Sequence, residues 1–385
     1  MTLKVAIIAG EASGDQLGAG MAAEIRRQSG GDVSFVGVGG PALEAEGLQS
    51  LFDIDDIAIM GISAVIARLP LLVRRINETA RALIEARPDV LVIVDSPGFT
   101  HRVAKKVRKA LPDLPVVQYV CPTVWAWKDY RAAKMTAYVD HVLAILPFEP
   151  DVMQRLGGPP TTYVGHRLRT LPAMAEARAQ QAARSRDGSE RTIVLLPGSR
   201  RTEVDRLLPV FGETALLLSR RGSYRFIIPA VPSQARGIGD AVGAWAVPVE
   251  VVTGEAEKWK ALAGADAALA AAGTVLFELA LVGIPTIAGY KTDFFIRLVL
   301  NRIRTWSAVL PNLVAGYPVF PEFYDEFLRP EMLARMLDRM SSDTPQRAAV
   351  IAGCADVHEK TATDRPANVV AAEIALRYAQ GKSPA

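Results

Sequence analysis

The chain alternates between short runs of apolar residues and longer segments in which apolar residues recur at helical spacing. Runs rich in β-branched residues predict strands, and the amphipathic segments between them predict helices. In the first half the predicted strands are Lys4–Ala9, Val33–Val36, Val90–Asp95 and Pro115–Tyr119, and the predicted helices are Gln16–Gln28, a helix from Pro41, Arg74–Ala86 and His101–Ala110. Alternation of this kind indicates βαβ units around a parallel sheet.

The same alternation starts again in the second half. A polar segment rich in Ala and Arg, which follows Tyr163–His166 and ends at Arg191, is the expected interdomain linker. Beyond it the predicted strands are Thr192–Leu196, Arg225–Ile228, Pro248–Val252, Ala267–Ala270 and Pro285–Ala288, and the predicted helices include Glu203–Arg220, Val275–Leu281 and several within Pro330–Tyr378. Two doubly wound halves predict a cleft between the carboxyl edges of two sheets, where ligands of such folds bind.

Length and composition narrow the class of protein. With 385 residues the chain suits two domains, because a domain has about 150 residues. A formal net charge of +3 argues against a dedicated nucleic-acid binder. Cys121 and Cys354 form no CxxC or Cys/His pattern, which favours a reducing compartment and disfavours a zinc site. The first residues, MTLKVAIIAG, lead directly into a predicted strand, and no signal peptide is expected. No apolar stretch of the sequence is long enough to span a bilayer.

The stretch Thr192–Val204, TIVLLPGSRRTEV, is a candidate anion site. A strand that turns through glycine into a helix N-terminus directs free backbone N–H groups and the helix dipole at the turn. Gly198 and Ser199 form the turn, and the guanidinium group of Arg200 suits phosphate oxygens. An ordinary βα loop with solvated arginines is the alternative interpretation.

A second glycine-rich turn, Gly10–Asp15 with the sequence GEASGD, follows the first strand. It is neither a dinucleotide-binding GxGxxG nor a P-loop. The expected cleft-lining residues of this turn are Glu11, Ser13, Gly14 and Asp15. A purely structural βα turn is the alternative.

Asp95 ends the strand Val90–Asp95 and precedes Ser96-Pro97-Gly98. A carboxylate at the carboxyl end of a buried strand is placed to act as a general base in a cleft. Capping of the following helix is the other role that the position allows.

Gly273-Thr274 opens another predicted helix directly after a strand, which suggests a second phosphate-binding helix N-terminus. Glu278, one turn further on, could accept hydrogen bonds from sugar hydroxyls. Asn312 lies in an irregular stretch that is also typical of a simple turn.

Two features suit a lipid surface. Met60–Val73 is apolar except for Ser63 and Arg68, and it fits an interfacial segment, an acyl-chain groove or a buried core helix. Its candidate lipid-contacting residues are Met60, Ile62, Val65, Ile66, Leu69, Leu71 and Leu72. A basic helix face, formed by Arg102, Lys105, Lys106 and Lys109, would be attracted to anionic lipid, or it is simply a solvated face.

Together these motifs resemble the lipid-A-disaccharide synthase family over nearly the whole chain. The matching motifs are GEASGD at Gly10–Asp15, GVGGP at Gly37–Pro41, MGISAV at Met60–Val65, DSPGF at Asp95–Phe99, YVCPTVWAW at Tyr119–Trp127, LPFE at Leu146–Glu149, VGH at Val164–His166, LLPGSR at Leu195–Arg200, GT…E at Gly273–Glu278 and PNLVAG at Pro311–Gly316. Thr100 and Arg167 depart from the family pattern, which often has Asn and Pro there.

The resemblance implies an inverting glycosyltransferase of the GT-B class. It would transfer the sugar of UDP-2,3-diacylglucosamine to the 6-hydroxyl of 2,3-diacylglucosamine 1-phosphate (lipid X), giving a β-linked lipid A disaccharide and UDP. By similarity Asp95 is the base, while Arg200, Glu278 and Asn312 serve the nucleotide-sugar site. The resemblance implies no cofactor and no metal, because helix ends and basic side chains stabilise the leaving diphosphate.

The resemblance also implies an organisation. An acceptor- and lipid-binding Rossmann-like domain is expected at 1–168, joined by C-terminal helices from about 345–385 that pack back on it, and a UDP-sugar-binding Rossmann-like domain at 190–344. The expected location is cytoplasmic, peripheral to the inner membrane, and a homodimer is one assembly consistent with the sequence. Another UDP-sugar GT-B enzyme, such as a UDP-N-acetylglucosamine 2-epimerase, and an inactive paralogue that only binds nucleotide sugar or lipid are the alternatives.

Overall fold

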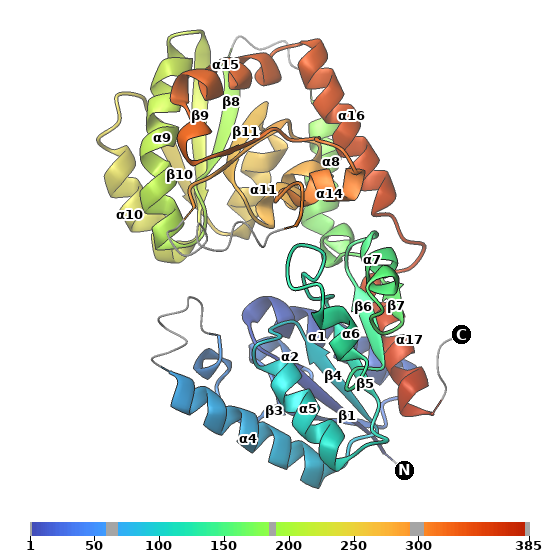
Figure 1. Ribbon diagram of the computed structural model, residues 1–385. Helices are drawn as coiled ribbons and strands as arrows, with labels where there is room; N and C mark the ends of the chain where they lie inside the picture. The colour runs from blue at the N-terminus through green and yellow to red at the C-terminus, as the bar shows by residue number, and fades with distance from the viewer. Residues whose placement is uncertain (1, 59–67, 185–189, 293–303, 382–385) are drawn as a thin grey trace. The chain divides into compact units, whose positions relative to one another are not determined.

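A computed structural model describes residues 2–58, 68–184, 190–292 and 304–381, and the chain folds into two compact units (Figure 1). Unit 1 contains Met1–Arg167 and Thr363–Ala385, and unit 2 contains Leu168–Ala362. Each unit is an α/β structure with its own parallel sheet. No helix in the described ranges is long and apolar enough to cross a membrane.

The sheet of unit 1 has seven strands in the order β3-β2-β1-β4-β5-β6-β7, and every neighbouring pair is parallel. The strands are β1 (Leu3–Ala9), β2 (Val33–Val38), β3 (Gln49–Ser50), β4 (Val90–Val94), β5 (Val116–Tyr119), β6 (His141–Ala144) and β7 (Thr161–Tyr163). All five residues of β4 are buried, as expected for a central strand with both faces covered.

Helices cover the two faces of this sheet. They are α1 (Ala12–Gln28), α2 (Pro41–Ala45), α4 (Leu69–Ala86), α5 (Thr100–Ala110), α6 (Arg131–Met135), α7 (Glu149–Arg155) and α17 (Ala367–Ala379). The C-terminal α17 packs against α1 and β4, and α4 packs beside α5 (Figure 1). The last helix therefore completes the core of the unit that the N-terminus begins.

The sheet of unit 2 has six parallel strands in the order β10-β9-β8-β11-β12-β13. They are β8 (Glu190–Leu196), β9 (Ser223–Ala230), β10 (Val249–Thr253), β11 (Ala267–Ala271), β12 (Thr286–Tyr290) and β13 (Glu322–Tyr324). The helices are α8 (Pro172–Ala183), α9 (Arg201–Ser219), α10 (Pro232–Val242), α11 (Glu255–Ala263), α12 (Val275–Val282), α14 (Leu310–Ala315), α15 (Pro330–Ser341) and α16 (Pro345–Lys360).

Three differences from the sequence prediction concern the first helix and the division into domains. The first helix begins at Ala12 rather than Gln16, so the last four residues of GEASGD already belong to it. The expected linker before Arg191 contains helix α8, which packs against α11 and α12 within unit 2. The return to unit 1 begins at Thr363 rather than near residue 345, because α16 packs against α12 and α14.

Asp266 joins several elements of unit 2. Its side chain, on a residue only 3% exposed, accepts hydrogen bonds from both terminal nitrogens of Arg184, at 3.0 and 2.9 Å. It also accepts one from the backbone N–H of Thr192 at 2.8 Å, and the Asp266 carbonyl accepts one from Arg347. A buried carboxylate with this many donors fixes the end of α8 to the start of β8 and β11.

We predict that Asp266→Ala lowers the free energy of unfolding by about 3 kcal/mol, because it leaves the Arg184 charge and the Thr192 N–H without their buried partner. The matched control is Asp205→Ala, which removes a carboxylate whose side chain is 65% exposed and lies 3.6 Å from the Arg201 Nε. That change should cost about 0.5 kcal/mol or less. Urea unfolding followed by circular dichroism measures both, and equal midpoints for the two variants would contradict the role of Asp266.

Candidate active site

In unit 1 the strand order reverses between β1 and β4, so the loops that follow these two strands lie side by side at the carboxyl edge of the sheet. A Cβ atom added at Gly10 would lie 2.3 Å from both Cβ and Oγ of Ser96. One added at Gly14 would lie 3.4 Å from the Val94 side chain. The glycines of the GEASGD motif therefore allow its backbone to pack directly on the DSPGF loop.

Asp95 lies where β4 ends, in a strained backbone conformation. Asp95 and Ser96 have φ values of 47° and 43°, a left-handed conformation that costs a non-glycine residue about 1–3 kcal/mol. The Asp95 N–H donates to the Tyr119 carbonyl of β5 at 3.0 Å, and the Thr100 hydroxyl donates to the Asp95 carbonyl at 2.7 Å. The hydroxyl at position 100, where the family pattern often has Asn, thus helps to hold the Asp95 loop in place.

The electrostatic environment of Asp95 favours a proton acceptor. Burial raises the pKa of its carboxyl, and the nearby negative charge of Glu11 raises it further. The backbone N–H of Ser96, which donates to Asp95 Oδ1 at 2.7 Å, opposes these effects. A carboxylate with a raised pKa is a stronger base than an ordinary aspartate, as general-base catalysis requires.

The other polar residues of the GEASGD motif have different environments. The Ser13 hydroxyl donates to Glu11 Oε1 at 2.5 Å, and this contact is exposed. Asp15 is only 4% exposed, and its carboxylate accepts the backbone N–H groups of Gly40, Ala42 and Leu43 at 2.7, 2.9 and 3.1 Å. Asp15 therefore caps the N-terminus of α2 instead of lining a cleft as the sequence suggested. This capping role explains why the GVGGP motif lies close to the Asp15 carboxylate.

Sequence reasoning gave no role to Glu149, which follows β6 in the LPFE motif. Its side chain is buried and accepts hydrogen bonds from the backbone N–H groups of Ile145 and Leu146, at 3.1 and 3.0 Å, and from Trp125 Nε1 at 3.3 Å. Burial raises the pKa of Glu149 to about 8, although the three donors act in the opposite direction. Nothing in the local sequence pattern shows that this carboxylate turns inward.

A pocket of about 460 Å³ in unit 2 brings together most of the predicted UDP-sugar residues. Its lining includes Gly198, Ser199, Arg200, Gly273, Thr274 and Glu278. The pocket lies where the strand order of the second sheet reverses between β8 and β11. Loops from both strands therefore contribute to it, as in other doubly wound folds that bind ligands at this position.

Two helices begin at this pocket. Helix α9 starts at Arg201 and α12 at Val275, and neither N-cap residue, Arg200 or Thr274, caps its helix with its own side chain. Gly198 has a φ of 115°, and an added Cβ would lie 2.6 Å from Glu203 Oε2, so only glycine fits this turn. The positive ends of two helix dipoles therefore lie at the pocket, which suits a phosphate group.

Charged side chains complete the pocket. Arg200 Nη1 lies 2.7 Å from Glu203 Oε1, in a partly exposed ion pair that costs little to rearrange. Lys258, which the sequence analysis did not single out, places its Nζ 3.3 Å from Glu278 Oε2 and 2.9 Å from Glu255 Oε2. Lys258 belongs to no recognisable motif, and only the fold shows that α11 directs it at Glu278.

Asn312 lies outside this pocket, contrary to the expectation that it serves the nucleotide sugar. It is fully buried, and its amide nitrogen donates to the Phe320 carbonyl at 2.9 Å and to Ser307 Oγ at 3.3 Å. Its amide oxygen accepts the backbone N–H groups of Val319 and Phe320 at 2.9 and 2.8 Å. These four bonds occupy the amide, so Asn312 braces the turn after α14.

The candidate lipid-contacting residues are only partly described. Met60, Ile62, Val65 and Ile66 lie outside the described residues. Leu69 is 45% exposed at the start of α4, while Leu71 and Leu72 are partly buried. Arg102, Lys105, Lys106 and Lys109 are all exposed on α5, as the helical spacing predicted.

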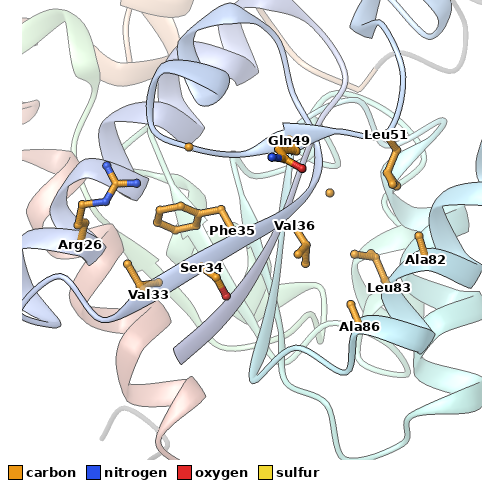
Figure 2. A pocket seen from close by; sticks show the side chains of 12 residues that line it. Arg26, Val33, Ser34, Phe35, Val36, Gln49, Leu51, Ala82, Leu83 and Ala86 are labelled. Carbon is orange, nitrogen blue, oxygen red and sulfur yellow. The ribbon is translucent and has the colours of Figure 1, made fainter. Parts of the chain in front are cut away.

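Unit 1 also has a cavity of about 480 Å³ away from these loops (Figure 2). Strand β3 pairs only with Val36 and Gly37, so the earlier part of β2 is left open beside α4. Phe35 and Arg26 lie at one side of the cavity, and Leu83 lies at the other. None of the predicted site residues lines it, and we assign it no role in the reaction.

Comparisons with known proteins identify the family of this chain. The family model described as lipid-A-disaccharide synthetase matches residues 5–372. The lipid-A-disaccharide synthase of Nitrobacter winogradskyi is 47% identical over 346 residues, which cover 89% of this chain and 87% of that protein.

Solved structures show the fold. The calicheamicin glycosyltransferase CalG4 superimposes with a TM-score of 0.60 at 14% identity, covering 100% of both chains. The UDP-GlcNAc 2-epimerase of Neisseria meningitidis, solved with UDP-GlcNAc, gives a TM-score of 0.59 at 11% identity and covers 99% of this chain and 100% of that one. The chain therefore belongs to the lipid-A-disaccharide synthetase family, and it is a glycosyltransferase of lipid A biosynthesis with the GT-B fold.

Proposed function

We propose that the protein transfers the diacylglucosamine group of UDP-2,3-diacylglucosamine to the 6-hydroxyl of 2,3-diacylglucosamine 1-phosphate. The products are the β-linked lipid A disaccharide 1-phosphate and UDP. The observation that carries this proposal is the position of Asp95, a strained and partly buried carboxylate with a raised pKa at the carboxyl end of a central strand. Membership of the lipid-A-disaccharide synthetase family supports the choice of substrates.

In the proposed reaction Asp95 takes the proton of the acceptor 6-hydroxyl as the oxygen attacks the anomeric carbon of the donor. The bond between that carbon and the UDP oxygen breaks on the opposite face, so an α-linked donor gives a β-linked product. Negative charge then develops on the leaving diphosphate. The N-termini of α9 and α12, together with Arg200, are placed to stabilise that charge.

The two units have different tasks in this proposal. Unit 1 supplies the base and binds the lipid acceptor, and unit 2 binds the UDP sugar. Glu278, held by Lys258, accepts hydrogen bonds from hydroxyl groups of the donor. Glu11 acts through its charge, which helps to keep the pKa of Asp95 high.

We also propose that the protein works in the cytoplasm at the inner face of the inner membrane. Helix α4 begins with the exposed apolar residues Leu69 and Val73, and the neighbouring α5 carries the exposed basic face. In the described ranges none of the four α5 cations forms an ion pair with a carboxylate. An apolar edge beside unpaired cations suits an anionic lipid surface.

Asp95→Asn should lower kcat by about 10²- to 10⁴-fold and leave UDP affinity unchanged, because it removes only proton transfer.

Wild-type activity should fall as the pH drops through the raised pKa of Asp95. Glu11→Gln removes one cause of that raised pKa, so the acid limb of the pH–rate profile should move to lower pH. Steady-state UDP release across pH measures both effects. If the acid limb of the Glu11→Gln profile lies at the same pH as that of the wild type, the group that titrates is not Asp95.

Arg200→Ala should weaken UDP binding by about 2 kcal/mol, because it removes a charge-assisted contact with the diphosphate. Isothermal titration calorimetry measures this directly. Arg201→Ala is the matched control, because the neighbouring guanidinium is on a side chain 85% exposed and does not line the pocket. The same loss of affinity in both variants would show a general charge effect instead of a specific contact.

Replacing Arg102, Lys105, Lys106 and Lys109 together by Gln should reduce binding to anionic liposomes, most clearly at low salt, where screening is weakest. Sedimentation with anionic and with neutral vesicles compares the two surfaces. Equal binding of the wild-type protein to both vesicle types would indicate that the basic face is only a solvated helix surface.

A further inference from the structure

The loop between β5 and α6 ends in two basic side chains around one tryptophan, with Lys128 in the loop and Arg131 at the first position of α6. Lys128 Nζ lies 3.8 Å from the centroid of the Trp127 ring, and Arg131 Cζ lies 5.8 Å from the same centroid. We call Trp127, Lys128 and Arg131 the Trp127 cluster. Cation–π attraction holds both positive groups against the indole, so their positions are set by the ring.

The charges of this cluster lack acidic partners. Within the part of the chain that the structure describes, no carboxylate forms an ion pair with Lys128 or Arg131. Other partly buried arginines of unit 1 do have such partners, since Arg75 pairs with Asp56 and Glu78, and Arg108 pairs with Asp140. Lys128 and Arg131 are themselves partly buried. Partly buried cations with no counter-charge are positioned to bind an anion.

The cluster belongs to the same edge of the sheet as Asp95. The loop leaves β5 directly after Tyr119, whose carbonyl accepts the Asp95 N–H. The positive charge of Arg131 also contributes to lowering the pKa of His101, after burial, the largest cause. His101 lies in the first turn of α5, next to Thr100, which binds the Asp95 carbonyl. Arg131 therefore lies near the start of α5, which holds the loop that carries Asp95.

The loop is fixed before any ligand binds. The Trp125 indole donates to the buried carboxylate of Glu149 and packs edge-on against Phe148, with ring centroids 5.5 Å apart. Lys128 has a φ of 55°, a conformation that a non-glycine residue keeps only where its surroundings require it. Such strain is typical of residues that a fold holds in place for binding.

We propose that Lys128 and Arg131 bind the phosphate group of the acceptor, and that Trp127 positions them. This inference rests on the proposed function, because it identifies the part of the acceptor that unit 1 recognises near Asp95. A phosphomonoester dianion suits the pair, since a guanidinium group can contact two of its oxygens and an ammonium group can neutralise a third.

The same chemistry could come from phosphate groups of membrane lipids. The structure favours the phosphate of the acceptor over that of a lipid, because Lys128 and Arg131 are partly buried near the loop that carries Asp95, whereas the cations of α5 are exposed. Exposed side chains would contact a membrane surface before partly buried ones. The experiment must therefore separate the acceptor phosphate from a charged bilayer.

The test compares two acceptors in neutral detergent micelles, one with the 1-phosphate and one without it. In the Lys128→Gln/Arg131→Gln variant the KM for the phosphorylated acceptor should rise at least about tenfold, as expected for a lost charge-assisted contact. The KM for the acceptor without phosphate and the KM for the UDP sugar should stay within about twofold. Arg131→Lys, which keeps the charge and loses the planar group, should recover part of the loss.

The matched control is Arg81→Gln/Arg155→Gln, which removes two exposed positive charges from unit 1 at α4 and α7. It should leave the preference for the phosphorylated acceptor unchanged. Circular dichroism and unchanged UDP affinity establish that each variant is folded. If the double variant is unstable, the single Lys128→Gln variant provides the same comparison of acceptors.

Three outcomes would overturn the inference. An unchanged preference for the phosphorylated acceptor shows that the cluster does not bind its phosphate, and an equal rise in KM for both acceptors shows a structural effect. Reduced binding to anionic vesicles with unchanged kinetics in neutral micelles assigns the cluster to the membrane. Absence of acceptor-dependent UDP release in the wild-type protein is a different failure, because it removes the proposed function, and the inference falls with it.

Discussion

Each sheet of this protein reverses its strand order once, and that reversal decides where chemistry can occur. On either side of the reversal the connecting helices lie on opposite faces, so the loops after the two central strands are left uncovered at the carboxyl edge. In unit 1 these loops carry Asp95 and the glycine-rich turn at Gly10, and in unit 2 they carry the helix starts at Gly198 and Gly273. The proposed base and the proposed anion-binding turns therefore occupy equivalent places in two similar units.

Close packing at these edges depends on particular side chains that turn inward. Asp15 holds the start of α2, and Glu149 holds the loop that contains Trp125. These carboxylates are buried, but each has several hydrogen-bond donors that offset part of the cost of removing it from water. Among the residues that the structure describes, Asp95 has one donor to its carboxylate, the Ser96 N–H, and burial and Glu11 therefore dominate its pKa. This contrast separates a carboxylate fixed for structure from one suited to accept a proton.

Sequence patterns were enough to predict the fold class and the turns of the candidate site. Strands β1, β4 and β8 were easy to predict from their apolar runs, because parallel strands that are buried on both faces need continuous apolar residues. The short strands β6 and β7 and the helix α8 were missed, because four or fewer residues, or a polar Ala/Arg-rich segment, give little periodic signal. Gly198, Arg200, Gly273 and Glu278 were brought together as expected, whereas Asn312, Asp15, Lys258 and Glu149 depend on tertiary partners that no local pattern encodes.

The most direct test of the proposed inverting transfer is the stereochemistry and acceptor dependence of one reaction. Purified protein would be incubated with UDP-2,3-diacylglucosamine, with and without 2,3-diacylglucosamine 1-phosphate and in the presence of EDTA. UDP release would be measured, and the new linkage would be assigned by NMR. An inverting transferase should release UDP only with the acceptor and give a β-linked disaccharide. Release without acceptor, or an α-linked product, would contradict it.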